Sequence, residues 1–479
     1  MADTVTTTLP TADFDGGSPR AQPHATWLEL FYDLVYIVAV AVLAHQFSDN
    51  AGIKGFAVFV GLFTPVWWSW AGHTIFESRF GRDDNFQRGM TLLQMLASAA
   101  MAIQIPQALG SGSAGFAVAY AATRAPLIVL YFRARAQNPE AHKLTTFLLA
   151  GYSAGAALWL ISIAVDPPLR FVFWALGTGI EFATFTLARK VARQFPVHTV
   201  HLPERVGLFT IIVLGEAILA IIIGIGDVHW NPLAVVAAIV GFAMATSIWW
   251  NYFGYVDRAV LECTLGNGQA YMFLHLPMLI GLITMRTGIE HIIGDSHRGV
   301  FPPETIAILG GGLALWIAAF YSLQLITYPP REGRRLTATY GLALVGIVAL
   351  IPLGGSLHPV GLAVIFGIVS VSITVLETQR RAAILTNVYS STGQTNIPVR
   401  RSEPKQYPGP DIIVQFDPKI CIHSAKCLTL LPGVFNLRNR PWVNAQGAGA
   451  EAIMKTIADC PSGALTYTLP QEITAEGRS

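Results

Sequence analysis

The stretch that decides the fold is RVGLFTIIVLGEAILAIIIGIG, residues 205–226, where one arginine and one glutamate interrupt a mostly apolar run. A helix crosses a bilayer with about 20 such residues. Twelve stretches meet this length rule, so the sequence predicts an all-α polytopic membrane bundle of about 12 transmembrane helices. The stretches are 27–47, 55–77, 88–108, 114–134, 145–166, 169–190, 205–226, 232–254, 269–293, 303–327, 335–355 and 358–379.

The composition supports lipid as the solvent of most of the chain. Hydrophobic residues make up 53% of the 479 residues and charged residues only 13%, against about 25% charged in ordinary soluble domains. So many apolar side chains cannot all be buried in soluble cores. The formal net charge of +2 does not indicate a nucleic-acid-binding protein, which would carry a basic stripe. We expect the lipid bilayer, and no nucleic acid, as a partner.

The basic residues predict the orientation in the membrane. Cytoplasmic loops retain Lys and Arg, and 16 of these residues follow the even-numbered stretches whereas three lie in the alternate loops. This bias predicts a multi-pass protein of the bacterial inner (plasma) membrane with both termini in the cytoplasm. Residues 1–26 lack the basic and apolar regions of a signal peptide, so we expect a disordered cytoplasmic leader there.

The two halves of the apolar region resemble each other. WWSWAG at 67–72 precedes WWNYFG at 249–254 by 182 positions, and at the same offset Asn85 and Gln87 correspond to Asn267 and Gln269. The pattern predicts a six-plus-six repeat over residues 27–203 and 204–381. Because six is even, the halves would run parallel, related by an axis along the membrane normal.

The character of the chain changes after residue 381. Residues 382–409 have no periodicity and are rich in Ser and Pro, which predicts a linker. Residues 410–470 predict a small α+β domain, with strands at Ile412–Phe416 and Leu465–Leu469 and an amphipathic helix around Glu451–Asp459. Residues 471–479 would form a tail.

Three of the four cysteines gather in this small domain. Cys421 and Cys427 belong to the loop CIHSAKC, and Cys460 opens CPSGAL. A short cysteine-containing loop with a distant Cys-Pro is typical of ferredoxins, whose thiolates bind iron–sulfur clusters. The middle cysteine of a bacterial ferredoxin loop is replaced by Ser424. Three thiolates suffice for a 3Fe–4S cluster, whereas a 4Fe–4S cluster needs a fourth ligand from Ser424, His423 or water.

Two other interpretations of these cysteines stay open. Zinc could be bound with His423 as the fourth ligand, although the paired short knuckles of common structural zinc sites are missing. The three cysteines could also be ordinary buried residues.

The small domain resembles the divergent single-cluster 4Fe–4S ferredoxin-like family. The resemblance rests on DPKICIH at 417–423, PGVF at 432–435, RPWV at 440–443 and CPSGAL at 460–465. It implies that Cys421, Cys427 and Cys460 are cluster ligands.

The membrane half resembles the low temperature requirement A (LtrA) family. The resemblance rests on WLELFYDLV at 27–35, and on ERVGLF at 204–209 with VLGEA at 213–217. It implies a multi-pass membrane protein, but the family carries no settled biochemical activity.

Ionisable side chains within the apolar stretches are candidate functional groups, because burying them in a membrane is costly. Glu29 and Asp33 are i, i+4 neighbours, as are Arg286 and Glu290. Glu216 falls near the middle of its stretch. The other candidates are His275, Arg124 and Glu181.

Less specific interpretations compete with these. Glu29 and Asp33 could sit in the interface at a helix start, where carboxylates favour the N-terminal dipole. Arg286 with Glu290 could be an interfacial ion pair, and the tryptophan pairs could be packing or belt residues.

Three functions fit the sequence. The first is electron transfer between the cluster and a cytoplasmic redox partner, with the membrane half as anchor or electron user. The second is a transporter or channel governed by the cluster, and the third is a scaffold with a structural cluster. No nucleophile–base set, P-loop or dinucleotide fingerprint is present, so the sequence does not decide whether the chain is an enzyme.

Overall fold

A computed structural model describes residues 26–192, 195, 201–228, 231–259, 267–296, 304–327, 330–392, 405–417, 426–436, 439, 441–458, 460 and 464–469. The chain forms two compact units. Ala25–Ile384 form the helical unit, and the second unit includes Leu385–Ser479. We refer to the described residues from 405 to 469 as the C-terminal module.

A long helix lies at each of the twelve predicted stretches of the helical unit. The first six are α1 (Trp27–Asp49), α2 (Ile53–Phe80), α3 (Asn85–Gln104), α4 (Ser113–Gln137), α5 (His142–Ile161) and α6 (Leu169–Leu187), followed by the short α7 (Arg189–Ala192). The others are α8 (His201–Asp227), α9 (Pro232–Ala259), α10 (Asn267–Asp295), α11 (Glu304–Thr327), α12 (Pro330–Leu350) and α13 (Pro359–Thr392). Short 3-10 turns follow α3, α4, α5 and α12.

Nine helices among the described residues have both the length and the apolar composition to cross a membrane. α2, α6 and α12 are the exceptions. α2 carries several tryptophans and polar residues, α6 carries Arg170 and Glu181, and α12 begins with a charged turn that leaves a shorter apolar helix at Thr337–Leu353. The membrane bundle is therefore confirmed, and the count of twelve spans stays a prediction.

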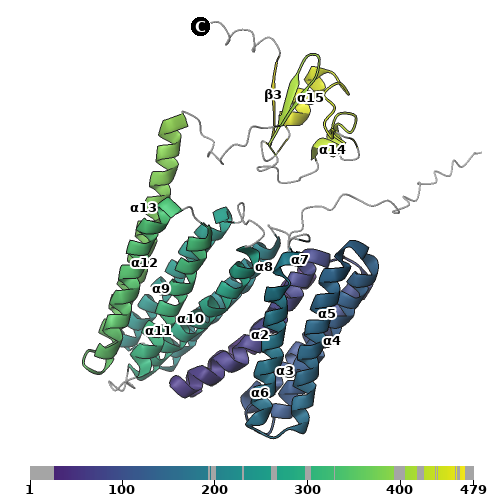
Figure 1. Cartoon of the computed structure of the whole chain (residues 1–479). Helices are drawn as coiled ribbons and strands as arrows, with labels where there is room; N and C mark the ends of the chain where they lie inside the picture. Colours follow the sequence, from purple (N-terminus) through teal and green to yellow (C-terminus); the bar gives the residue numbers. More distant parts are fainter. Residues whose placement is uncertain are drawn as a thin grey trace, which may run out of the picture. The chain divides into compact units, whose positions relative to one another are not determined.

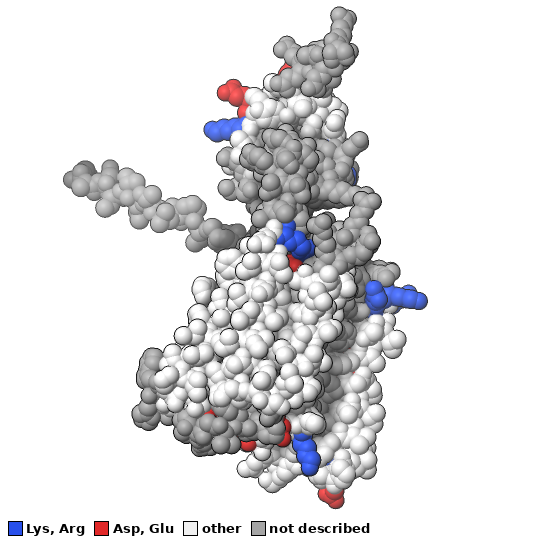
Figure 2. All heavy atoms as spheres, turned by 90° about the vertical axis from the view of Figure 1, so that its left-hand side faces the viewer, with Lys and Arg blue, Asp and Glu red and all other residues white. Residues whose placement is uncertain are grey.

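The outer surface of the helical unit suits lipid. Large apolar side chains are exposed along its helices, among them Leu96 of α3, Phe132 of α4 and Ile239 of α9. On the face seen in Figure 2, a broad belt of uncharged side chains lies between charged groups near the two ends of the unit. In water such a surface would drive aggregation, whereas hydrocarbon solvates it.

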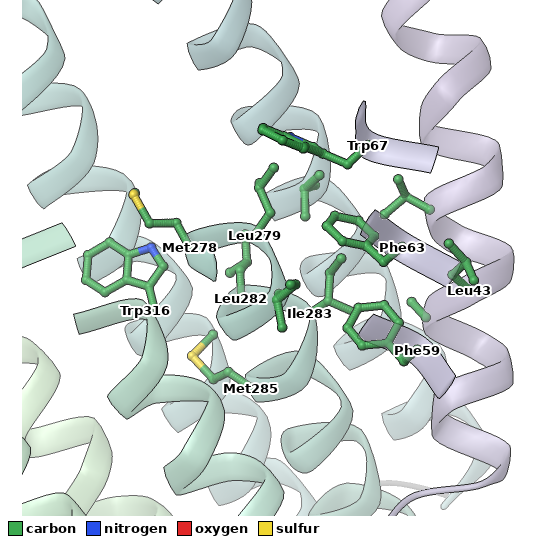
Figure 3. Close-up of a cluster of buried hydrophobic side chains, with 14 of the residues drawn as sticks. Leu43, Phe59, Phe63, Trp67, Met278, Leu279, Leu282, Ile283, Met285 and Trp316 are labelled. Carbon is green, nitrogen blue, oxygen red and sulfur yellow. The ribbon is translucent and has the colours of Figure 1, made fainter. Parts of the chain in front are cut away.

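The two halves of the helical unit pack through their first helices. α1 contacts α2 and α3 in the first half, and α8 contacts α9 and α10 in the second. α1 and α2 meet α8 and α10 across the boundary, with α3–α6 on one side and α9–α13 on the other (Figure 1). Figure 3 shows part of this apolar contact, where Phe59, Phe63 and Trp67 of α2 face side chains of α10.

Close helix packing depends on glycine at two crossings. A Cβ atom on Gly155 of α5 would lie 2.6 Å from Cγ of Glu181, and one on Gly288 of α10 would lie 2.6 Å from the backbone of Leu309. Small residues at such contacts let helix backbones approach in a membrane, where there is no hydrophobic force between helices. These glycines therefore set the α5–α6 and α10–α11 distances.

The C-terminal module contains a three-stranded antiparallel sheet in the order β1-β2-β3. The elements are β1 (Lys405–Pro408), β2 (Ile413–Phe416), α14 (Lys426–Leu430), α15 (Ala450–Ala458) and β3 (Leu465–Thr468). Ile413 pairs with Pro408 on one side and with Thr468 on the other. The core beneath the sheet includes Val414, Phe435, Val443 and Ile453. The predicted α+β pattern is confirmed.

The predicted linker over 382–409 is wrong at both ends. α13 continues to Thr392 and β1 already begins at Lys405, so only residues 393–404, which lie outside the described residues, are left for a linker. A helix that has nucleated in the membrane propagates at one hydrogen bond per residue. β1 is a polar edge strand whose partner is β2, so its own sequence carries no apolar alternation.

Asp84 illustrates how polar residues fix the helix ends. Its carboxylate caps α3 by accepting from the backbone N–H of Gln87 at 2.9 Å, and it accepts two hydrogen bonds from Arg133 of α4 at 2.9 and 2.6 Å. The Arg133 guanidinium lowers the pKa of this carboxyl from 3.8 to about 2. The neighbouring Asp83 instead pairs with Arg88 in a far more exposed ion pair.

We predict that Asp84→Ala lowers the free energy of unfolding by about 1 kcal/mol or more, because it removes both the cap and the ion pair. The matched change Asp83→Ala should stay within about 0.5 kcal/mol of the parent. The loss at Asp84 should be complete above pH ~4 and vanish as the pH falls through about 2, since the folded state holds the ionised form. Unfolding in detergent measures both changes, and equal losses would contradict this role of Asp84.

Candidate iron–sulfur centre and polar sites

Two of the candidate iron–sulfur ligands, Cys427 and Cys460, are described, and both border the core of the module. Cys427 is in α14 and Cys460 follows α15, and both side chains are half-buried against the core that contains Phe416 and Ile457. α14 packs against α15, so two cysteines that are 33 positions apart in sequence border the same core. Cys421, His423 and Ser424 lie outside the described residues, and the part of the module that the structure describes contains no group of three metal-ligating side chains.

These two thiols suit an iron–sulfur cluster. A ferredoxin-type site needs thiolates from a short loop and from a distant Cys-Pro segment to face one centre. Cys427 ends the short loop, and Cys460 is the cysteine of the Cys-Pro pair. Their half-buried positions on one apolar core are what such a centre requires of them. The two described donors, the thiols of Cys427 and Cys460, are of the type that an iron–sulfur cluster needs.

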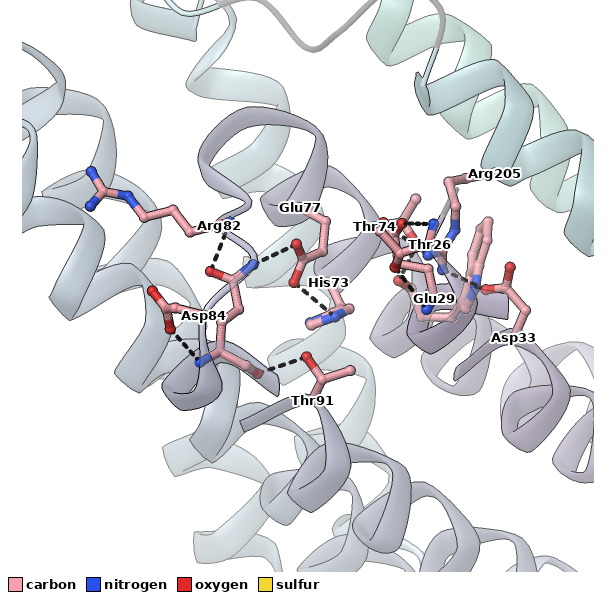
Figure 4. A network of polar contacts seen from close by, with 12 residues as sticks. Thr26, Glu29, Asp33, His73, Thr74, Glu77, Arg82, Asp84, Thr91 and Arg205 are labelled. Atoms are coloured by element: carbon pink, nitrogen blue, oxygen red, sulfur yellow. Dashed lines mark hydrogen bonds and ion pairs between the residues drawn. The ribbon is translucent and has the colours of Figure 1, made fainter. Parts of the chain in front are cut away.

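Glu29, Asp33, His201 and Arg205 form a buried group that we call the inter-half ion cluster. Arg205 of α8 lies 2.6 Å from Asp33 through Nη2 and 3.0 Å from Glu29 through Nη1 (Figure 4). His201 Nε2 lies 3.0 Å from Glu29 Oε1. Trp70 of α2 donates its indole N–H to Asp33 at 2.7 Å. Asp33 and Arg205 are fully buried.

The inter-half ion cluster joins the first helix of each predicted half. Glu29 also completes the capping box of α1, because its side chain accepts from the N–H of Thr26 at 2.7 Å. Glu29 therefore serves the helix start, as one interpretation held, and binds across to α8 as well. Asp33 lies one turn deeper and is no interfacial residue. Buried charges are tolerated only when paired in this way.

A second buried pair links α4 to α6. Arg124 donates to both carboxylate oxygens of Glu181, at 3.2 and 2.5 Å. Its guanidinium also stacks over the rings of Tyr120 and Tyr152, at 4.9 and 5.5 Å. Both charged side chains have no exposed surface. The pair is thus satisfied within the first half, and its role is to hold α4 against α6.

Residues 24–375 match the family described as bacterial low temperature requirement A protein (LtrA). The chain belongs to the LtrA family. Residues 407–470 match a second family, described as divergent 4Fe-4S mono-cluster. The chain is thus a membrane protein that combines an LtrA region with a divergent 4Fe–4S domain.

The chain is similar to two kinds of relative, one over a long stretch and one over a short stretch. RA0937 of Rhizobium meliloti, named as uncharacterised, is 25% identical over 365 residues, which cover 69% of this chain and 88% of that protein. YjdI of Escherichia coli K12, also named as uncharacterised, is 39% identical over 61 residues, 13% of this chain and 80% of that protein. The first relative is similar to most of this chain, and the second to a stretch of 61 residues.

The other candidates of the LtrA region lie apart from the inter-half ion cluster. Arg286 and Glu290 of α10 pair at 2.7 Å and are partly exposed, and Glu290 also accepts from Ser48 of α1 at 2.7 Å. His275 is fully buried, with Tyr252 OH 2.8 Å from Nε2 and Tyr271 O 2.7 Å from Nδ1. Both sites are hydrogen-bonded helix contacts.

Glu216 stays a prediction. Its side chain on α8 is half-buried, and no hydrogen bond or ion pair joins it to another residue within the described ranges. The structure therefore does not bring Glu216 to Glu29 and Asp33.

The two tryptophan motifs have different environments. Trp67 and Trp68 are fully buried, so they are packing residues, whereas Trp249 and Trp250 expose 42% and 47% of their surface. The matching sequences therefore do not occupy matching environments.

Sequence reasoning missed His201 and Arg205 of the LtrA region. Arg205 had been counted as a basic loop residue, but it is buried inside the bundle. Their spacing could have revealed them. His201 and Arg205 are i, i+4 neighbours at the start of the most apolar stretch, and Glu29 and Asp33 have the same spacing at the start of the first half. The positive-inside count of 16 therefore includes a residue, Arg205, that is fully buried within the bundle.

We predict that Arg205→Gln lowers the free energy of unfolding of the LtrA region by about 3–5 kcal/mol, because it leaves two buried carboxylates without their cation. Adding Asp33→Asn should restore part of the loss, since one buried charge disappears. Arg286→Gln, which affects a partly exposed pair, should cost about 1 kcal/mol or less. Unfolding of the three variants in detergent measures this, and an additive double variant would contradict the coupling.

Proposed function

We propose that the chain is a membrane-anchored electron carrier. Its C-terminal module would hold one iron–sulfur cluster on Cys421, Cys427 and Cys460 and exchange electrons with a cytoplasmic redox partner. The observation that carries the proposal is that Cys427 and Cys460 border one core in a domain of the divergent 4Fe–4S family, fused to a membrane region.

The residues of the module suit this role. When bound, the cluster supplies one-electron chemistry. The thiolates of Cys427 and Cys460, which are half-buried against the apolar core, would be two of the ligands that hold the cluster. Half-burial keeps the centre accessible to a partner surface and limits contact with water. Whether three or four irons are held depends on Ser424, His423 or water as the fourth ligand.

The membrane topology belongs to the same proposal. Twelve spans in two parallel halves, 27–203 and 204–381, would leave both termini in the cytoplasm, as the basic residues predict. Helix packing supports the repeat, because the contacts of α1 with α2 and α3, and of α3 with α4, recur as α8 with α9 and α10, and α10 with α11. The domains at 410–470 and 471–479 would then lie on the cytoplasmic side.

We predict that anaerobically purified protein contains iron and sulfide and gives an EPR signal on reduction or oxidation. Cys427→Ser and Cys460→Ser should each remove most of this signal, because each takes away a thiolate ligand. Cys263→Ser is the matched control, since Cys263 belongs to the membrane half, and it should retain the signal.

Three outcomes would contradict the cluster proposal. One is the absence of any cluster signal from anaerobic protein. The second is stoichiometric zinc in place of iron, which would favour the zinc site with His423. The third is an equal loss in the Cys263→Ser control.

A second candidate function, transport of an ion or solute, is favoured by the inter-half ion cluster. Parallel six-helix halves often carry a pathway along their interface, and this interface contains paired charges deep among the helices. Charged residues at such depth commonly mark pathways in transporters. The iron–sulfur cluster would then regulate this pathway and would not act as an electron carrier.

Flux measurements in proteoliposomes test this candidate. We predict that Glu216→Gln abolishes flux if the half-buried carboxyl of α8 faces the pathway, whereas Glu140→Gln, at an exposed position between α4 and α5, leaves it unchanged. Flux that persists in Glu216→Gln would exclude this residue from a pathway.

A further inference from the structure

Polar side chains of α2 form a buried row that neither proposed function uses. Ser69, His73 and Glu77 are spaced by four residues, which places them on one face of the helix. Ser69 and His73 are fully buried, and the Glu77 side chain retains 12% exposure. The row therefore runs from near the surface at the α2–α3 end of the bundle into its interior.

Contacts from α1 and α3 extend the row. His73 Nε2 lies 3.3 Å from Glu77 Oε1 (Figure 4). The ring of Tyr32 of α1 lies tilted against the His73 ring, with 4.5 Å between the ring centroids. Further in, the Ser69 hydroxyl donates to the Tyr36 hydroxyl at 2.9 Å. Carboxyl, imidazole and hydroxyl groups thus follow one another from the outer end inward.

Gln87 of α3 fixes the orientation of Glu77. Its carbonyl Oε1 accepts the backbone N–H of Arg82 at 3.1 Å, so its amide N–H₂ must face the carboxyl, and it donates to Glu77 Oε2 at 2.5 Å. One carboxylate oxygen is therefore occupied by a donor, and the other faces His73. A metal ion would meet the amide hydrogens of Gln87, so the geometry disfavours a metal ligand set.

Several polar atoms along α2 and α3 are buried without a hydrogen-bond partner among the described residues. They include both ring nitrogens of His73, of which Nε2 approaches Glu77 only as an ion-pair contact, and both amide atoms of Gln94, which lies two turns along α3 from Gln87. Each such atom is costly when left alone. Their presence indicates that small hydrogen-bonding species, water or a proton carried by water, belong in this part of the first half.

Among the described residues, no Lys or Arg side chain forms an ion pair with Glu77. The titratable and charged groups that face His73 and Glu77 are Tyr32 and Glu29 of α1, Arg205 of α8 and Asp83 of the α2–α3 loop. Arg205 is already paired with both Glu29 and Asp33. A second ionised carboxylate at Glu77 would be poorly compensated in this low-dielectric setting.

We propose that His73 and Glu77 form a proton-binding site of the first half, reached from the α2–α3 end, with Tyr32, Tyr36 and Ser69 extending it inward. In the uptake step an O–H bond of hydronium breaks and an O–H bond forms on the free oxygen of Glu77, so no electron is transferred. The bound proton is shared with the imidazole, and the pair takes or gives one proton as a unit. Carboxyl–imidazole series of this kind serve as proton relays in membranes. The site does not depend on the iron–sulfur cluster.

Infrared titration of the full chain in nanodiscs tests the site. The protonated carboxyl of Glu77 should give a carbonyl stretch that disappears with rising pH and that Glu77→Gln removes. His73→Asn should move the midpoint of this titration by about one pH unit or more, equal to about a tenfold change in proton affinity, because it removes the group that shares the proton. Glu140→Gln is the surface control and should change neither.

Two results would overturn the proposal. One is a spectrum in which Glu77→Gln removes no titrating carboxyl stretch, and the other is an unchanged midpoint in His73→Asn. Glu77→Asp retains a carboxyl group, so it is the control for a loss of signal that is caused by misfolding. It should retain a titrating stretch at a shifted midpoint, and the loss of that stretch in folded protein would also count against the site.

Discussion

The pairing of Arg205 with Asp33 and Glu29 is the constraint on which the arrangement of the membrane region depends. An unpaired charge at this depth would be prohibitive, so α8 can pack only where both carboxylates of α1 meet its guanidinium. The indole N–H of Trp70 donates to the same carboxylate oxygen of Asp33 that Arg205 contacts. One arginine thereby fixes the rotation of α1, α2 and α8 about their axes and the contact between the two halves.

Apolar packing fills the remainder of that contact. The aromatic side chains of α2 and the aliphatic side chains of α10 belong to one continuous core (Figure 3). Because lipid is as apolar as these side chains, their packing contributes dispersion more than a hydrophobic force. Specificity between the halves therefore comes chiefly from the buried charges, and close fit comes from the aromatic residues of α2 and the side chains of α10.

The C-terminal module follows the rules of a soluble domain. Its small core packs against three short strands and two helices, and Cys427 and Cys460 both border that core. Below about 70–80 residues a single core supplies little stability, so a bound cluster would contribute to folding as well as to chemistry. This dual role suits a cofactor whose ligands come from separate elements of the module.

The sequence by itself determined the membrane character, the helices and the ligand motif. Hydropathy marks each apolar stretch locally, and Cys421, Cys427 and Cys460 stand in a spacing that carries its chemistry without the fold. It also identified Glu29, Asp33 and the Arg124 and Glu181 side chains as costly in a membrane. It could not pair them, because Arg205 is 172 residues from Asp33 and lies at the edge of a predicted loop. It did not pair His73 with Glu77 for a similar reason, since polar residues of α2 form a buried site only when α1 and α3 cover them. Periodicity and composition are local properties, so they predict where each helix forms and which side chains are costly to bury. The partner of a buried charge depends on the packing of helices that are distant in sequence.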